Sequence, residues 1–176
     1  MMVRNFLWVL MSGLLWTACK TADSNPVAPE YVIKGILLFD FNAQAMGKVG
    51  TPDDDILEAN DVELNIFPNP ARESFSFYFL SRNNADTAFT YKISHVAYPA
   101  APDSILIYDG TPYRTVLPVV VENKGKAGQE VLKASIALDR DRSEKTIEIK
   151  DFPKGFYRLF VETNTSTRLR VAFYKY

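Results

Sequence analysis

The chain has 176 residues, a formal net charge of −1 and 13% aromatic residues. With so balanced a charge it has no basic stripe that could follow a phosphate backbone, so nucleic acid is not an expected partner. One cysteine cannot form an intramolecular disulfide and is too few for a structural zinc site, whereas the length suits one domain with a sizeable core.

The first 18 residues have the pattern of a secretory signal. Arg4 precedes an almost wholly apolar run from Phe6 to Trp16, shorter than the about 20 residues of a membrane-spanning helix. Ala18 and Cys19 end this segment, and the order resembles a bacterial lipoprotein signal, in which a small residue precedes a lipidated cysteine. The resemblance implies cleavage before Cys19, lipidation of Cys19 and anchoring in a membrane. The alternative is an ordinary signal peptide cut near Ala18, with an incidental Cys19.

Residues 19–30 are polar and contain prolines, which is typical of a tether, and residues 31–176 are predicted to form one β-domain. The run from Ile33 to Phe41 is apolar on both faces and predicts a central strand. Asn42 to Gly50 is predicted to be a loop. A short helix is expected from Thr51 to Glu58, because Thr51 can cap it and the following acids suit its positive end.

Alternating apolar and polar residues dominate the rest of the chain and predict strands with one buried and one wet face. The alternating segments are 62–66, 74–79, 89–94, 132–138, 146–150, 157–162 and 168–173. Residues 105–108 and 116–121 are apolar on both faces and predict central strands, although Pro118 favours an edge. About ten short strands separated by turn residues predict an all-β fold, an antiparallel Ig-like β-sandwich with one short helix.

Two short motifs flank most of this domain. The first places Pro68, Asn69 and Pro70 before the strand that begins at Ser74, and the second places Gly155 and Tyr157 in a turn after Pro153. Together they resemble the type IX secretion C-terminal sorting domain of Bacteroidetes, a small Ig-like β-sandwich. The resemblance implies an exported Bacteroidetes protein with this fold. The segment between the motifs is longer than that family usually has, and a sorting domain normally follows a larger secreted cargo.

No catalytic constellation or metal site is predicted. His95, the only histidine, has no serine–acid pair marked out beside it and is expected to be structural or to lie on the surface. Acids between Asp53 and Asp61 could bind calcium, but their spacing differs from that of an EF-hand loop, and a solvated helix start is favoured.

Six aromatic residues raise the question of a binding platform. They lie opposite the better-defined apolar faces or near the chain end: Tyr78, Tyr108, Phe156, Phe160, Tyr174 and Tyr176. Aromatic side chains are enriched in surfaces that bind proteins and sugars. Burial against the domain's own segments is nevertheless the favoured interpretation.

These observations favour a non-catalytic binding or accessory module without a cofactor. It would be anchored by lipid to the outer membrane, on the periplasmic or surface face, and would have a protein or glycan partner. One alternative is a type IX secretion substrate, in which residues from about Val62 onward are the sorting signal. A further alternative is a glycan-active hydrolase whose acids meet only in the fold. A retained C-terminus favours the accessory module, and its loss favours the sorting signal.

Overall fold

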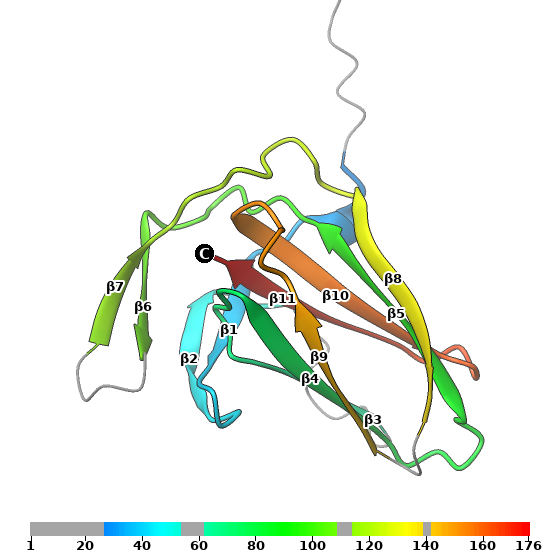
Figure 1. Cartoon of the computed structure of the whole chain (residues 1–176). Helices are drawn as coiled ribbons and strands as arrows, with labels where there is room; N and C mark the ends of the chain where they lie inside the picture. Colours follow the sequence, from blue (N-terminus) through cyan, green and yellow to red (C-terminus); the bar gives the residue numbers. More distant parts are fainter. Residues whose placement is uncertain (1–26, 54–61, 109–113, 139–141) are drawn as a thin grey trace, which may run out of the picture.

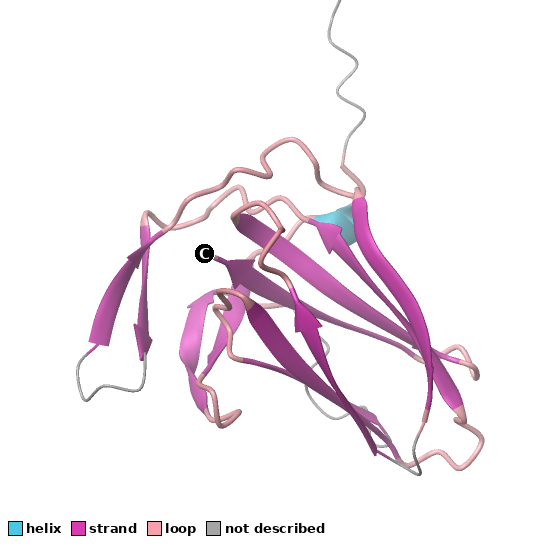
Figure 2. Cartoon of the chain, in the orientation of Figure 1, coloured by secondary structure: helices cyan, strands magenta, loops and turns pink. Residues whose placement is uncertain are grey.

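The computed structural model describes residues 27–53, 62–108, 114–138 and 142–176. It confirms the all-β prediction (Figures 1 and 2), since the described residues form eleven strands and a single 3-10 turn, Pro29–Tyr31. All neighbouring strands within a sheet pair antiparallel. No helix in these described ranges has the length and apolarity needed to span a membrane.

Two sheets make the sandwich (Figure 1). The first has the spatial order β11 (Arg168–Lys175), β10 (Gly155–Thr163), β5 (Ala88–His95) and β8 (Glu130–Ala137). The second has the order β3 (Val62–Phe67), β4 (Ser74–Ser81) and β9 (Arg142–Glu148). The chain changes sheet after β4, after β8 and after β9, as is usual in β-sandwiches.

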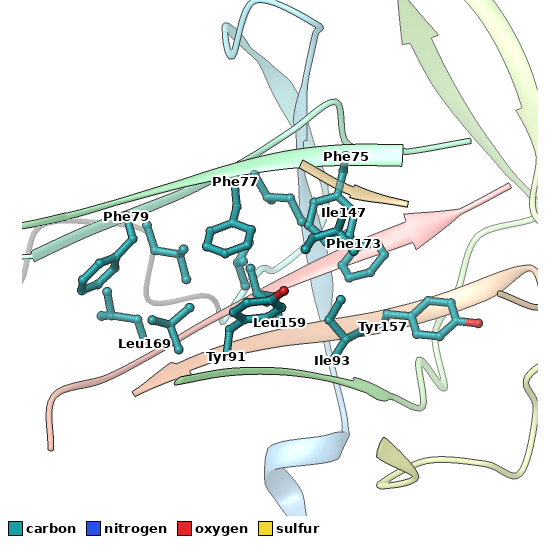
Figure 3. Packing of buried hydrophobic residues seen from close by; sticks show 14 of the residues in the cluster. Phe75, Phe77, Phe79, Tyr91, Ile93, Ile147, Tyr157, Leu159, Leu169 and Phe173 are labelled. Atoms are coloured by element: carbon teal, nitrogen blue, oxygen red, sulfur yellow. The ribbon is translucent and has the colours of Figure 1, made fainter. Parts of the chain in front are cut away.

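The main core lies between these two sheets (Figure 3), where Phe75, Phe77 and Phe79 of β4 point toward the four-stranded sheet. Alternation along β4 places all three rings on one face, and each is almost completely buried. The Phe77 and Tyr91 ring centroids are 5.3 Å apart in an edge-to-face arrangement. This confirms the buried faces that the alternation in residues 74–79 and 89–94 predicts.

A second core covers the other face of the four-stranded sheet. Here Phe156 and Tyr174 pack with Ile33, Ile36 and other apolar residues of the N-terminal segment. The predicted wet faces of β10 and β11 are therefore wrong at Arg158 and Ala172, which are buried, and confirmed at Glu162 and Arg168, which are exposed. The favoured burial of the aromatic residues is confirmed for Phe156 and Tyr174.

Two hairpins flank the sandwich and correct further predictions. The first pairs β1 (Gly35–Phe39) with β2 (Ala45–Gly50), and the second pairs β6 (Ser104–Tyr108) with β7 (Arg114–Pro118). The loop prediction for residues 42–50 is wrong for residues 45–50, which form β2, and is confirmed for residues 42–44. The central-strand predictions for all three apolar runs are also wrong, because each belongs to a two-stranded sheet. The edge position that Pro118 favours is confirmed for β7, whose only partner in the sheets described is β6.

Residues 27–53, here called the N-terminal strap, are fixed to the sandwich by Arg158. This side chain is fully buried, and its guanidinium donates to the main-chain oxygen of Glu30 at 2.8 Å and to Asp53 Oδ1 at 2.5 Å. The 3-10 turn and Glu30 show that packing contacts begin within the segment predicted to be a tether. Residues 51–53 are not helical, and residues 54–58 of the predicted helix lie outside the described ranges.

Candidate functional site

Asn69, between the two prolines of the first motif, joins three distant segments. It is fully buried, and its Nδ2 donates to the main-chain oxygens of Leu37 at 2.6 Å and Ala172 at 3.0 Å. Its Oδ1 accepts from the main-chain nitrogen of Tyr174 at 3.2 Å. The Asn69 main chain also exchanges two hydrogen bonds with Phe39, so one residue holds the end of β1 against β11.

The flanking prolines shape the turn that presents Asn69. The peptide bonds preceding Pro68 and Pro70 are both cis. Directly after them, the Ala71 nitrogen donates to Tyr174 O at 2.9 Å, and the Tyr176 nitrogen donates to Ala71 O at 3.1 Å. The Pro-Asn-Pro turn therefore lies along the last residues of β11.

Gly155 and Tyr157 of the second motif pack around Asn123. Gly155 has φ +149°, and a Cβ there would lie 1.9 Å from Asn123 Oδ1, so only glycine fits against this amide. Asn123 Nδ2 lies 2.8 Å from Phe156 O and 3.0 Å from His95 Nδ1. The Tyr157 hydroxyl donates to Pro153 O at 2.5 Å, and burial raises the pKa of this phenol well above its usual range.

The register brings both motifs to the same end of β11. Gly155 pairs with Lys175 and Tyr157 with Phe173, while Asn69 contacts the neighbouring residues 172 and 174. Except for half-buried Pro68, all the motif residues are buried. The contacts of Asn69, Gly155 and Tyr157 therefore stabilise the fold, and these three residues do not form an exposed recognition surface. Cys19 lies outside the described ranges.

An apolar groove begins at this turn. Pro68 and Pro70 form one part of its wall, and the remainder comes from the β1–β2 hairpin, from β6 and from Tyr176. Its cavity is small, about 80 Å³, but large apolar side chains are exposed around it: Phe41 is 63% exposed and Leu106 50%. Val116, directly opposite Leu106 in the hairpin register, is 59% exposed. The groove and these three side chains are the candidate binding surface.

Sequence reasoning missed this surface because apolar residues on both faces of a segment predict a central strand. In β6 the two faces have different environments: Ile105 belongs to the second core, whereas Leu106 faces outward. The one signal that pointed to it was Pro118, which disfavours a central strand.

The other candidates for chemistry have mainly structural surroundings. His95 is buried, and its pKa is lowered by burial and, to a lesser extent, by the charge of Lys126. Asp53 of the predicted acidic cluster pairs with Arg158, and the cluster's other acids lie outside the described ranges. In the described part of the chain no three His, Cys, Asp or Glu side chains gather in a way that could hold a metal ion.

The aromatic residues proposed for a platform do not form one surface. Phe156 and Tyr174 are buried, and the Tyr174 hydroxyl accepts from the Val120 nitrogen at 2.7 Å, which holds the loop after β7. Tyr78, Phe160 and Tyr176 are half-buried, and the side chain of Tyr108 is outside the described set.

No protein-family model matches the chain, and a comparison with curated proteins finds no significant match.

Proposed function

We propose that this protein is a non-catalytic binding module of the cell envelope, anchored by lipid at Cys19, and that its partner is another protein. The observation that carries the proposal is the candidate binding surface, where Phe41, Leu106 and Val116 are exposed around an apolar groove. Exposed apolar patches of this kind are typical of protein–protein contacts.

A protein partner is favoured over a glycan by the chemistry of the surface. Leu106 and Val116 are aliphatic and form a cross-strand pair on the outer face of the β6–β7 hairpin. Sugars are usually held by exposed aromatic rings together with polar groups, whereas this surface combines one exposed ring, Phe41, with exposed aliphatic side chains. The surface therefore suits an apolar partner segment.

The anchor is supported by the order of residues at the start of the chain. A basic residue, a short apolar run and a small residue come before Cys19, and a polar tether follows it. A free thiol without a structural partner would be a reactive group on an exported protein, and lipidation would give it a role.

The sorting-signal alternative is supported by the convergence of both motifs at one end of β11. The packing of the N-terminal strap favours the module. The strap's Ile33 and Ile36 belong to the second core together with Phe156, so residues from Val62 onward do not form a separate packed unit.

The first experiment is the intact mass of the protein purified from its own membranes. We expect an added diacyl or triacyl group on Cys19 and an unshortened chain that still includes Tyr176. An unmodified Cys19 together with loss of the C-terminal domain would instead assign this domain as a secretion signal.

The partner is tested by site-specific photocrosslinking in cells. A crosslinking amino acid at Leu106 or Val116 is expected to capture a discrete protein. The matched control is Lys133, which is exposed on the edge strand β8 and should give no such product. Equal capture at all three positions would show that the partner does not bind preferentially at this surface, and would contradict the proposal.

A further inference from the structure

A second hollow, an open cleft of about 510 Å³, lies where β11 ends and β10 begins. Its walls carry four cationic side chains, those of Arg72, Lys150, Lys154 and Lys175, and one acidic side chain, Glu73. Arg72, Lys150 and Lys154 are exposed. In the described part of the chain, none of the four cations lies within ion-pair distance of a side-chain carboxylate. This basic cleft is therefore suited to an anionic ligand.

Lys175 gives the cleft a cationic floor. The residue is only 7% exposed, and its ammonium donates to the main-chain oxygen of Tyr176 at 3.1 Å. An ammonium has three N–H donors, and the bond to Tyr176 uses one of them. Phosphate oxygens suit a site built from one arginine and several lysines, and they accept from the ammonium donors that the Tyr176 oxygen leaves unused.

The loop after β7 connects the basic cleft with the start of the N-terminal strap. The Glu122 nitrogen donates to Lys154 O at 2.8 Å, and the Lys154 nitrogen donates to Glu122 Oε2 at 2.9 Å. Two residues further along, Lys124 shares with Val27 a hollow of about 360 Å³. The cleft, this loop and Val27 together define one end of the sandwich. Glu122, an acid, and Lys124 are both exposed at this end.

Exposed apolar side chains accompany the positive charge at this end. Val27, Val120 and Val121 are 42%, 43% and 38% exposed. The chain from Cys19 to Val27 can span at most about 28 Å when fully extended. A lipid on Cys19 would therefore keep this end of the sandwich within a short distance of the bilayer.

We propose that this end of the sandwich lies on an anionic bilayer, with the basic cleft binding lipid headgroup phosphates and the three valines contacting the interface. The inference rests on the proposed lipid anchor and names the surface that the anchor holds in place. Basic side chains combined with apolar ones are the usual composition of a surface that binds anionic membranes.

The test uses the complete mature chain, residues 19–176, with Cys19→Ser so that no lipid contributes. Flotation compares vesicles of phosphatidylcholine with vesicles that also contain phosphatidylglycerol. We expect binding only to the anionic vesicles, weakening as salt is added. The Lys150→Glu/Lys154→Glu variant should bind at least about 25-fold more weakly, because each lost basic residue near such a surface costs about fivefold and the two new carboxylates add repulsion.

The matched control is Lys133→Glu/Lys145→Glu, which makes the same change in net charge at exposed positions on β8 and β9. Its vesicle binding should stay within about twofold of that of the unsubstituted chain, since neither side chain lines the cleft. Urea unfolding of both variants, whose substituted residues are exposed, verifies that the fold is intact.

Equal losses in the two variants, or no binding to anionic vesicles at low salt, would overturn the inference. Calorimetry with inorganic pyrophosphate separates the two sources of phosphate. Pyrophosphate binding that depends on Lys150 and Lys154, without vesicle binding, would overturn the lipid assignment in favour of a soluble phosphate ligand. Vesicle binding by this chain together with an unmodified Cys19 in the native protein would support the surface and reject the anchor.

Discussion

At the scale of single residues, Asn69 is a fully buried polar side chain that connects three separate segments. Its buried amide uses both donors and an acceptor on main-chain groups of Leu37, Ala172 and Tyr174. Asn69 is fully buried, and its bonds to Ala172 and Tyr174 are buried as well, so removing the amide takes hydrogen-bond partners away from groups inside the protein. The cost of a substitution here is therefore expected to exceed that of an ordinary polar contact.

Replacing Asn69 by alanine should lower the free energy of unfolding by about 3 kcal/mol, as measured by urea denaturation. The control is Asn65→Ala, because Asn65 also donates from its amide, to Glu63 and Tyr78, but is only partly buried. That control should lose less than about 1 kcal/mol. Similar small losses in both variants would contradict the role assigned to Asn69.

His95 makes stability depend on pH. Burial, aided by the charge of Lys126, lowers its pKa below the ordinary value of 6.5. As the pH falls below 6.5, the unfolded chain takes up a proton at this residue before the folded chain does. The stability that neutral His95 contributes is therefore fully present above that pH, and it decreases as the pH falls toward the lowered native pKa.

The His95→Gln variant retains an acceptor for Asn123 but cannot titrate. Its free energy of unfolding should change less than that of the wild type between about pH 7.5 and about pH 5.5. Urea denaturation at the two pH values measures both slopes. Parallel slopes in the two proteins would show that His95 does not titrate differently in the folded state. Asp86 does not interfere, because its pKa is lowered from 3.8: hydrogen bonds from Ser81, Thr165 and Thr163 outweigh the opposing effect of burial.

At the scale of elements, the β6–β7 hairpin has two apolar faces with different roles. Ile105 is buried in the second core, whereas Leu106 and Val116 face outward. A two-stranded hairpin is only marginally stable in water, so it depends on the inner contact. The outer face is then available for the proposed partner.

Substitutions at neighbouring positions of β6 should separate these roles. Ile105→Ser is expected to destabilise the protein by about 3 kcal/mol, because it loses core packing and buries a hydroxyl. Leu106→Ser should change stability by less than about 0.5 kcal/mol, since the side chain is half exposed. Thermal or urea unfolding measures both, and the opposite ranking would mean that the outward face has been assigned to the wrong side of the hairpin.

At the scale of the whole molecule, sequence reasoning predicted the parts that local patterns control. Alternation in residues 74–79 predicts the buried face of β4 correctly, because a period of two is a property of the strand itself. Burial on the second face of β10 could not be predicted in this way, since Phe156 and Arg158 are covered by the N-terminal strap.

The candidate site was less predictable for the same reason. Pro68 and Pro70 indicate a turn, but nothing near them shows that Asn69 contacts residues 172 and 174. The groove exists only because two hairpins and this turn meet, which depends on the tertiary structure. The exposure of Leu106 likewise follows from the absence of a covering sheet in the described structure.

Removing the N-terminal strap should therefore affect the whole fold. A chain of residues 62–176 lacks Ile33 and Ile36 over Phe156, and it leaves the Arg158 guanidinium buried without Glu30 and Asp53. Residues 27–176 are expected to show a single cooperative unfolding transition in calorimetry, and we expect the shorter chain to lose it. A transition at the same temperature in both chains would instead make the strap an appendage and strengthen the sorting-signal alternative.

The position of β10 and β11 in the four-stranded sheet has a consequence for biosynthesis. β10 pairs with both β5 and β11, so the sheet is incomplete until residues 155–175 have been translated. A nascent chain that ends earlier exposes the rings of β4 and has no partner strand for the inner edge of β5. For the exported protein that we propose, this delay keeps the polypeptide unfolded and able to pass through a narrow translocation channel. Chaperones that bind apolar segments would then be required until synthesis of the chain is complete.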